Sequence, residues 1–195
     1  MESKIFRSVK ASHDTTTKLY KFRNTVRPPG YVPYVVDNLW EWKRPKIYPS
    51  RRFSVYASPK ESSAKKSGPD GGAVYRVEFG GKYKLCQLKD YEDSRHHPNC
   101  RDLRKLLFKK LGQDWMDGEL KDKEPAGRLW IPCLTKHEMN YLFGSNETLR
   151  EFREEIYNAI TYWNDVVLIG NNMPLADPVG EVFFEAEDGY YLRSI

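Results

Sequence analysis

Apolar side chains recur at the spacing of a helix face in three stretches of the chain. Residues 31–42 place valine, leucine and tryptophan on one such stripe, which is typical of an amphipathic helix. Leucines with the same spacing predict a second helix over residues 101–111. A third helix is expected to begin after Ser145 or Asn146, whose side chains suit an N-cap, and to continue to about Asp165.

Strands are predicted where apolar and polar residues alternate. The clearest alternation covers residues 73–79, and the glycine pair that follows is typical of a turn. Residues 83–88 are therefore expected to return as the second strand of a hairpin. Residues 53–58 also have strand composition and stop at Pro59, because proline has no N–H for a ladder.

Further strands are predicted near both ends of the chain. Residues 19–22 alternate before a Pro-Pro-Gly sequence that ends them, and residues 166–169 are a short apolar run. The Asp188-Gly189 pair predicts a hairpin turn, so Glu181 is expected to open a terminal hairpin. Strands at both ends with helices between them predict an α+β fold.

The remaining stretches are mostly polar. Residues 1–18 are expected to form a loose tail or a weak edge strand ahead of one domain that spans residues 19–195. Residues 60–72 are rich in glycine and serine and are predicted to be a mobile loop. Residues 113–128 are interpreted as a second polar connector, and residues 129–134 as a short buried segment.

The composition fits a folded protein with a modest positive charge. Of the 195 residues, 39% are hydrophobic and 14% aromatic, whereas disordered chains are poor in both. The 13 tyrosines and 5 tryptophans predict an aromatic core or a cleft that stacks on flat ligands. The net charge of +5 comes from interspersed charges and permits an anionic partner without prescribing nucleic acid. The basic side of the 101–111 helix is therefore interpreted first as a solvated face.

The cysteines and histidines indicate neither a disulfide framework nor a metal site. Cys86, Cys100 and Cys133 are widely spaced and form no paired motif. The adjacent His96 and His97 would point apart, and zinc needs three or four converging ligands. No apolar run near the N-terminus is long enough for a signal peptide or a membrane span. The chain is expected in the cytoplasm of its own cell or, for an effector, of a target cell.

Arg23 is the first candidate for binding chemistry. It follows the strand predicted over residues 19–22, and Arg27 lies just beyond it. A guanidinium is always charged, and its five donors can grip a phosphate or a carboxylate in a bidentate manner. Taken alone, a solvated arginine at a strand end is the commoner interpretation.

Arg23, Ser58 and Glu181 follow one another in an order that resembles the arginine–serine–glutamate class of mono-ADP-ribosyltransferases, the pertussis-toxin type. The similarity is strongest at Phe-Arg-Asn-Thr-Val-Arg-Pro-Pro around Arg23, and it is good at Glu-Val-Phe-Phe, where the family's catalytic glutamate opens a strand. The resemblance implies an α+β domain with an ADP-ribosyltransferase-like split β-sandwich and flanking helices.

The chain departs from that family in its second strand and before its glutamate. The family's Ser-Thr-Ser is Tyr-Ala-Ser here, so either Ser58 or Tyr56 is expected to orient the glutamate. Members that modify arginine carry a second glutamate two residues before the catalytic one, where this chain has Val179. A competing register would use Glu185 and Glu187 as the paired glutamates.

The resemblance implies that NAD is the substrate. Cleavage of the nicotinamide–ribose bond generates an oxocarbenium-like cation, and Glu181 would stabilise that charge as it develops while holding the ribose 2′-hydroxyl. Arg23 would hold the phosphate or the ribose, and Tyr56 would stack on nicotinamide. The NAD-binding residues implied in this way are Arg23, Arg27, Tyr56, Ser58 and, as weaker candidates, Arg51 and Arg52.

Three alternatives stay open on the sequence alone. A nucleic-acid-binding or RNA-modifying protein is suggested by the pI near 9.0 and the basic helix, and its affinity would fall steeply with salt. A non-catalytic interaction module on the same fold would turn over no NAD. A glycohydrolase would consume NAD without an acceptor and use the same residues. The sequence leaves open whether the acceptor is a protein or a nucleic acid.

Overall fold

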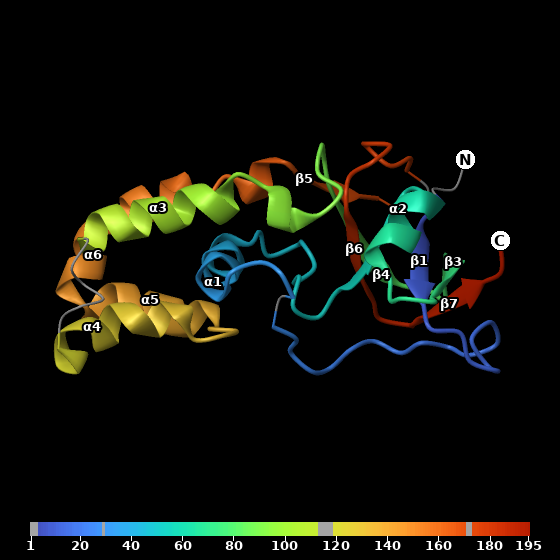
Figure 1. Cartoon of the computed structure of the whole chain (residues 1–195), viewed down its shortest axis with the longest axis horizontal. Helices are drawn as coiled ribbons and strands as arrows, with labels where there is room; N and C mark the ends of the chain where they lie inside the picture. The colour runs from blue at the N-terminus through green and yellow to red at the C-terminus, as the bar shows by residue number, and fades with distance from the viewer. Residues whose placement is uncertain (1–3, 29, 113–118, 171–172) are drawn as a thin grey trace. The chain divides into compact units, whose positions relative to one another are not determined.

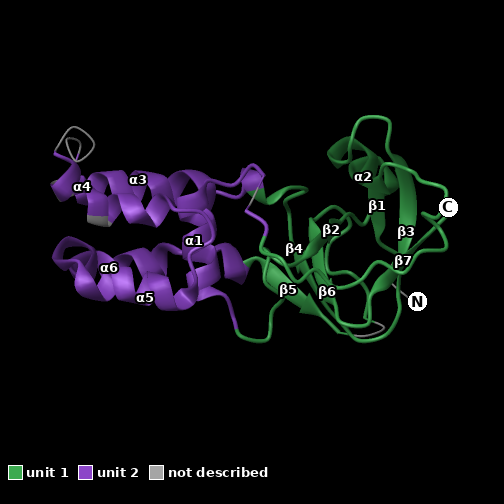
Figure 2. Cartoon of the chain, turned by 90° about the horizontal axis from the view of Figure 1, so that it is seen from below, with its two compact units in different colours: residues 1–26, 46–94, 165–195 green, residues 27–45, 95–164 purple. Residues whose placement is uncertain are grey.

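The computed structural model describes residues 4–28, 30–112, 119–170 and 173–195 (Figure 1). The chain forms two compact units, which Figure 2 shows in different colours: residues 1–26, 46–94 and 165–195 in the first, and residues 27–45 and 95–164 in the second. The described strands belong to the first unit, and most of the helices belong to the second. The predicted α+β class is confirmed.

The first unit contains two antiparallel sheets that share one hydrophobic core. Side chains from both sheets, among them Val77, Leu85, Phe184 and Leu192, are buried in a single cluster. The first sheet has the order β1-β3-β7, with β1 (Phe6–Val9), β3 (Ala73–Phe79) and β7 (Tyr190–Arg193). The second has the order β2-β6-β4-β5, with β2 (Val55–Ala57), β6 (Val182–Ala186), β4 (Tyr83–Leu88) and β5 (Val166–Ile169).

Two turns carry the chain from one sheet to the other. The strand pairs β3–β4 and β6–β7 were predicted to be hairpins, but the members of each pair lie in different sheets, so both predictions are wrong. The turns contact each other instead: Gly80 N–H donates to the Gly189 carbonyl at 2.9 Å, and Lys82 N–H donates to the Asp188 carboxylate at 2.7 Å. A Cβ atom on Gly81 would lie 2.3 Å from Asp188 Oδ2, so any other residue there would displace the Asp188 side chain.

The stretch before Arg23 is irregular, which corrects the strand predicted over residues 19–22. Tyr20 forms an isolated bridge with Tyr190 of β7, and the two rings stack with their centroids 5.3 Å apart. Leu19 and Phe22 remain 38% and 41% exposed. The alternating pattern therefore buries too little apolar surface to fix a strand.

Two other segments of the first unit bear on the predictions. Residues 6–9 are an edge strand, which is one of the two conformations that the sequence left open. The loop predicted over residues 60–72 is wrong in part, because it contains helix α2 (Glu61–Ser67) beside β1 and β3. An acidic residue in the first turn of α2 and two lysines in the last turn complement the helix dipole.

The second unit is helical and has an aromatic core. Trp40 stacks on Tyr162 with ring centroids 3.9 Å apart, and Trp42 stacks on Phe143 at 4.6 Å. The helices predicted over residues 31–42 and 101–111 are confirmed as α1 and α3. The elements are α1 (Tyr34–Lys43), α3 (Asn99–Leu111), α4 (Leu120–Gly127), α5 (Lys136–Ser145) and α6 (Glu147–Ala159), with 3-10 turns η3 (Arg128–Trp130) and η4 (Tyr162–Asn164); the turn η1 (Ser94–His96) begins in the first unit.

Helix α6 begins as predicted and ends earlier. The Asn146 side chain accepts a hydrogen bond from Leu149 N–H at 2.8 Å and caps the helix. The helix stops at Ala159 rather than near Asp165, because the next residue, Ile160, takes an extended conformation and is fully buried.

The region before α6 holds two helices that were not predicted. Part of the predicted connector over residues 113–128 is helix α4, and residues 113–118 lie outside the described residues. Helix α5 starts with a capping box, in which Thr135 and Glu138 each bond the other's backbone N–H. Within residues 129–134, both ends are buried, but Ile131 is 49% exposed.

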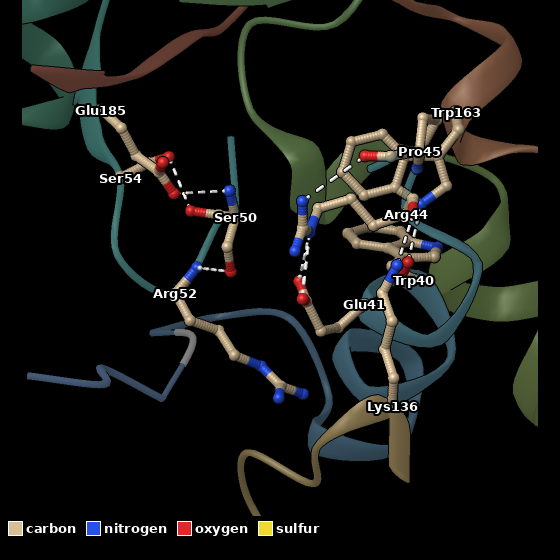
Figure 3. A network of polar contacts seen from close by, with 10 residues as sticks. All are labelled: Trp40, Glu41, Arg44, Pro45, Ser50, Arg52, Ser54, Lys136, Trp163 and Glu185. Atoms are coloured by element: carbon tan, nitrogen blue, oxygen red, sulfur yellow. Dashed lines mark hydrogen bonds and ion pairs between the residues drawn. The ribbon is translucent and has the colours of Figure 1, made fainter. Parts of the chain in front are cut away.

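A polar network ties α1 to α5 in the second unit. Arg44 Nε lies 3.0 Å from both oxygens of Glu41, and Lys136 Nζ donates to the Arg44 carbonyl at 2.6 Å (Figure 3). The Trp163 indole N–H donates to the Trp40 carbonyl at 2.7 Å. Burial of the Lys136 ammonium lowers its pKa from the usual value. These bonds satisfy the backbone groups at the C-terminal end of α1.

Candidate functional site

Glu181 directly precedes β6, and its backbone is fixed on both sides. Its N–H donates to the Tyr91 carbonyl at 2.7 Å, and its carbonyl accepts from Leu88 N–H at 2.9 Å. Gly180 approaches Leu88 so closely that a Cβ atom would lie 1.8 Å from the Leu88 carbonyl oxygen. Only glycine fits there. Glu181 therefore stands at the opening of a strand, as the sequence predicted.

Asp177 and Gln87 hold the loop that leads to Glu181. The Asp177 carboxylate accepts backbone N–H bonds from Val179, Gly180 and Asp90 at 2.6, 2.8 and 2.9 Å. Gln87, fully buried in β4, donates to the Asp177 carbonyl at 2.6 Å and accepts from its N–H at 3.0 Å. Burial opposes the ionisation of Asp177, but the backbone bonds outweigh it and hold the pKa below its usual value.

The Glu181 carboxylate meets a guanidinium and a hydroxyl. Arg51 Nη1 lies 3.1 Å from Glu181 Oε2, and the Ser94 hydroxyl donates to the same oxygen. Arg51 Nη1 also donates to Ser94 Oγ at 2.7 Å. The side chains of Arg51 and Glu181 are 7% and 13% exposed, and Ser94 is fully buried. These three residues form a buried polar group that we call the Glu181 cluster.

Two aromatic rings lie beside the guanidinium of this cluster. The Arg51 Cζ atom is 5.1 Å from the Tyr56 ring centroid and 5.3 Å from that of Phe183, which is within cation–π range. The Tyr56 hydroxyl donates to the Arg51 carbonyl at 2.8 Å. Tyr56 and Phe183 are also register partners between β2 and β6. The structure thus brings Tyr56, a predicted site residue, to the Glu181 cluster.

Ser58 lies at the end of the same strand pair. The register of β2 and β6 ends at Ala57 and Val182, so Ser58 and Glu181 are the next residue on each strand. The backbone of Ser58 exchanges hydrogen bonds with Phe6 at 2.7 and 2.8 Å, and Ser58 is 5% exposed. Within the described ranges, the hydroxyl that contacts Glu181 belongs to Ser94.

Arg23 lies by a different glutamate. It lines a small pocket together with Glu185, and Phe22 and Phe53, also in the lining, stack with ring centroids 6.4 Å apart. Among the residues that the structure describes, Arg23 forms no hydrogen bond or ion pair with Glu181. Arg23, which was predicted to bind NAD, therefore shares a pocket with Glu185, the glutamate of the competing register.

The surroundings of Glu185 are visible in Figure 3. Its Oε1 accepts from Ser50 N–H at 2.7 Å, and the Ser54 hydroxyl donates to the Ser50 carbonyl at 2.7 Å. Arg52, in the same turn, is 5% exposed, and its side chain extends away from Glu185 in the figure. Glu187, the second glutamate of that register, is exposed beyond the end of β6.

Arg27 is the last of the predicted NAD-binding residues. Arg27 is half-buried and belongs to the second unit. Within the described part of the chain, no group of three or more His, Cys, Asp or Glu side chains could hold a metal ion. No helix among those residues is long and apolar enough to cross a membrane.

Comparison with known proteins leaves the chain without a match. No family model, no curated protein and no solved structure matches it.

The sequence missed Ser94 and gave Arg51 a different role. Arg51 was a weak candidate for binding NAD, whereas the structure pairs it with Glu181. Ser94 lies in a charged loop without a recognisable motif, far along the chain from both partners. No local signal could have found that contact, because it depends on the turn that follows β4.

Proposed function

We propose that the chain is a mono-ADP-ribosyltransferase, which cleaves the nicotinamide–ribose bond of NAD and transfers ADP-ribose to a macromolecular acceptor. The observation that carries the proposal is the buried Glu181 cluster beside the Tyr56 ring. A carboxylate held in a fixed orientation is suited to stabilise a positive charge that develops in a transition state. The order Arg23, Ser58, Glu181 adds support, because it resembles the arginine–serine–glutamate transferases.

The two oxygens of the proposed catalytic carboxylate have different surroundings. Arg51 and Ser94 both contact Glu181 Oε2, and no described residue bonds Oε1. Oε1 can therefore accept a hydrogen bond from a ribose hydroxyl while Oε2 remains anchored. In this proposal Ser94 takes the orienting role that the resemblance gives to a serine of the second strand.

The proposed reaction breaks one bond and forms one bond at the ribose. The bond between ribose C1′ and the nicotinamide nitrogen breaks, and nicotinamide leaves as a neutral molecule with the electron pair. Glu181 stabilises the cationic ribose, a nucleophile of the acceptor bonds to C1′, and that nucleophile loses its proton. Tyr56 offers a ring for nicotinamide and Arg23 a charge for phosphate. Water in place of the acceptor gives the glycohydrolase reaction.

The test compares three single substitutions along one strand and its turn. NAD labelled in its adenylate half is incubated with a cell lysate and either the wild type, Glu181→Gln, Glu185→Gln or Glu187→Gln. Label transfer and nicotinamide release are both measured. We expect Glu181→Gln to lower nicotinamide release by about 100-fold or more, the scale on which loss of one electrostatic stabiliser acts. The two control variants should keep most of the activity.

Each outcome distinguishes the proposal from an alternative. Loss of activity in Glu185→Gln but not in Glu181→Gln would transfer the catalytic role to the pocket that Arg23 lines. Nicotinamide release without label transfer would indicate a glycohydrolase. A wild type that neither releases nicotinamide nor transfers label would favour a non-catalytic module. A melting curve of each variant separates loss of chemistry from loss of fold.

A further inference from the structure

Helix α3 presents one basic face to solvent. Arg101, Arg104, Lys105 and Lys109 are all exposed on it, and Phe108 lies among them. Their spacing places these five residues on one side of the helix, whereas Leu103 and Leu107 on the opposite side are buried. We call these five residues the α3 basic face.

Acidic side chains of the helix offset little of this charge. Asp102, the acidic residue of α3, pairs with Arg101 at 2.7 Å. The hydrogen bond from Arg101, together with the nearby charge of Lys105, lowers the pKa of Asp102. Within the described ranges, Lys105 and Lys109 form no hydrogen bond and no close ion pair. The α3 basic face therefore carries four positive charges, and the helix supplies one carboxylate to offset them.

An exposed aromatic ring lies within this charged surface. Phe108 is 40% exposed, and its ring centroid lies 6.3 Å from that of the half-buried Trp130. Proteins that bind single strands combine such a basic track for the backbone with rings on which bases stack. We propose that the α3 basic face binds single-stranded nucleic acid. The proposal goes beyond the NAD chemistry and can be tested without it.

The neighbouring helix shows that this charge is not a general property of the unit. Helix α6, which packs beside α3, carries four glutamates and two arginines. Lys110, at the edge of α3 next to α6, pairs with Glu155 of that helix. Opposite charges are thus paired where the helices meet, and the unbalanced positive charge is left on the solvent side of α3.

The experiment measures binding of a fluorescent oligonucleotide of about 12 nucleotides, a length within the range of known single-strand sites. RNA and DNA versions of one mixed sequence are titrated with the whole chain, and anisotropy is recorded across a series of salt concentrations. The test variant is Lys105→Glu/Lys109→Glu. The matched control is Lys60→Glu/Lys65→Glu, two exposed lysines at α2. Both lower the net charge from +5 to +1, because each exchange removes two charges.

We expect the test variant to bind at least about tenfold more weakly than the control variant. Four phosphate contacts would give the wild type a slope of log K against log salt near −3, at about −0.7 per contact for single strands, and the test variant should lose about half of it. Phe108→Ala should weaken binding about fivefold or more and leave that slope unchanged, because stacking is not a charge contact.

Three results would overturn the proposal. The first is no binding by the wild type at low salt, and the second is equal weakening by the test and control variants. The third is an unchanged affinity in Phe108→Ala together with equal binding of heparin, since this would indicate a general polyanion surface. If Lys105→Glu/Lys109→Glu lowers the melting temperature, Lys105→Gln/Lys109→Gln replaces it and is compared with Lys60→Gln/Lys65→Gln, which has the same net charge.

Discussion

Glu181 and Glu185 belong to one strand region and share its face, yet their surroundings differ. Side chains alternate along a strand, so both residues project to the side that also carries Phe183. Glu181 is held through one oxygen by a buried guanidinium and a buried hydroxyl. Glu185 accepts a backbone N–H from Ser50 beside the pocket that Arg23 lines.

Position on the strand therefore does not decide which glutamate is suited to catalysis. A carboxylate bound by side chains from two other segments is fixed before a substrate arrives, and this preorganisation is what stabilises a transition state. Glu181 has that arrangement, but the predicted phosphate-binding arginine lies by Glu185. Substitutions of each glutamate and of its supporting residues should therefore have separate effects.

The largest effect is expected from Arg51→Met. Removal of the guanidinium leaves Glu181 buried without its cationic partner, and breaking a buried ion pair in this way costs about 3–5 kcal/mol in the free energy of unfolding. Urea denaturation of the wild type and the variant measures the loss. In the double variant Arg51→Met/Glu181→Gln, part of the stability should return because no charge is left unpaired. A cost below about 1 kcal/mol for Arg51→Met would show that the pair is effectively solvated.

A second large effect is expected from Gly180→Ala. Its Cβ atom would lie 1.8 Å from the Leu88 carbonyl oxygen, so the backbone before Glu181 must move. Overpacking of this kind costs about 1–3 kcal/mol, and NAD turnover should fall with it. Gly144→Ala is the matched control, because no atom lies within 4 Å of its Cβ position in α5. That exchange should be neutral or stabilising, since alanine favours a helix.

Acid titration of stability should reveal the role of Asp177 in the same loop. Its pKa is lowered in the folded protein, so its carboxylate contributes stability above the unfolded pKa of about 3.9. That contribution is lost as the pH falls through the lower, folded value. The difference in unfolding free energy between the wild type and Asp177→Asn should be constant above about pH 5 and shrink below about pH 4. A difference that does not depend on pH would contradict the hydrogen-bond pattern.

The sequence predicted elements better than their pairing. Periodicity located α1, α3, β3 and β4, because each is encoded by a local alternation of apolar and polar residues. A glycine turn after β3 predicts a change of direction, but it does not specify which sheet receives the next strand. The hairpin predictions failed for that reason. The capping box at Thr135 and Glu138 was a local signal that would have predicted α5.

Some residues of the candidate site could be predicted from the sequence, and others could not. Glu181 could be found from its strand, and Tyr56 from the strand beside it. Ser94 could not, because its contact with Glu181 depends on the conformation of the loop after β4. The sequence also could not predict that Arg23 and Glu185 line one pocket. Residues 19–22 form no regular strand, so their pattern does not fix the direction of the Arg23 side chain.

The smallest effect is expected from Glu185→Gln. A glutamine side-chain oxygen can accept the Ser50 N–H bond as a carboxylate oxygen does, so the substitution keeps this contact. The unfolding free energy should change by no more than about 0.5 kcal/mol, whereas Glu181→Gln should cost about 1.5–3 kcal/mol, the range for a hydrogen bond to a charged group. Parallel urea titrations of the two variants measure this difference. A larger loss in Glu185→Gln than in Glu181→Gln would contradict this expectation. It would show that the carboxylate in the pocket that Arg23 lines contributes more to stability than the carboxylate of the Glu181 cluster.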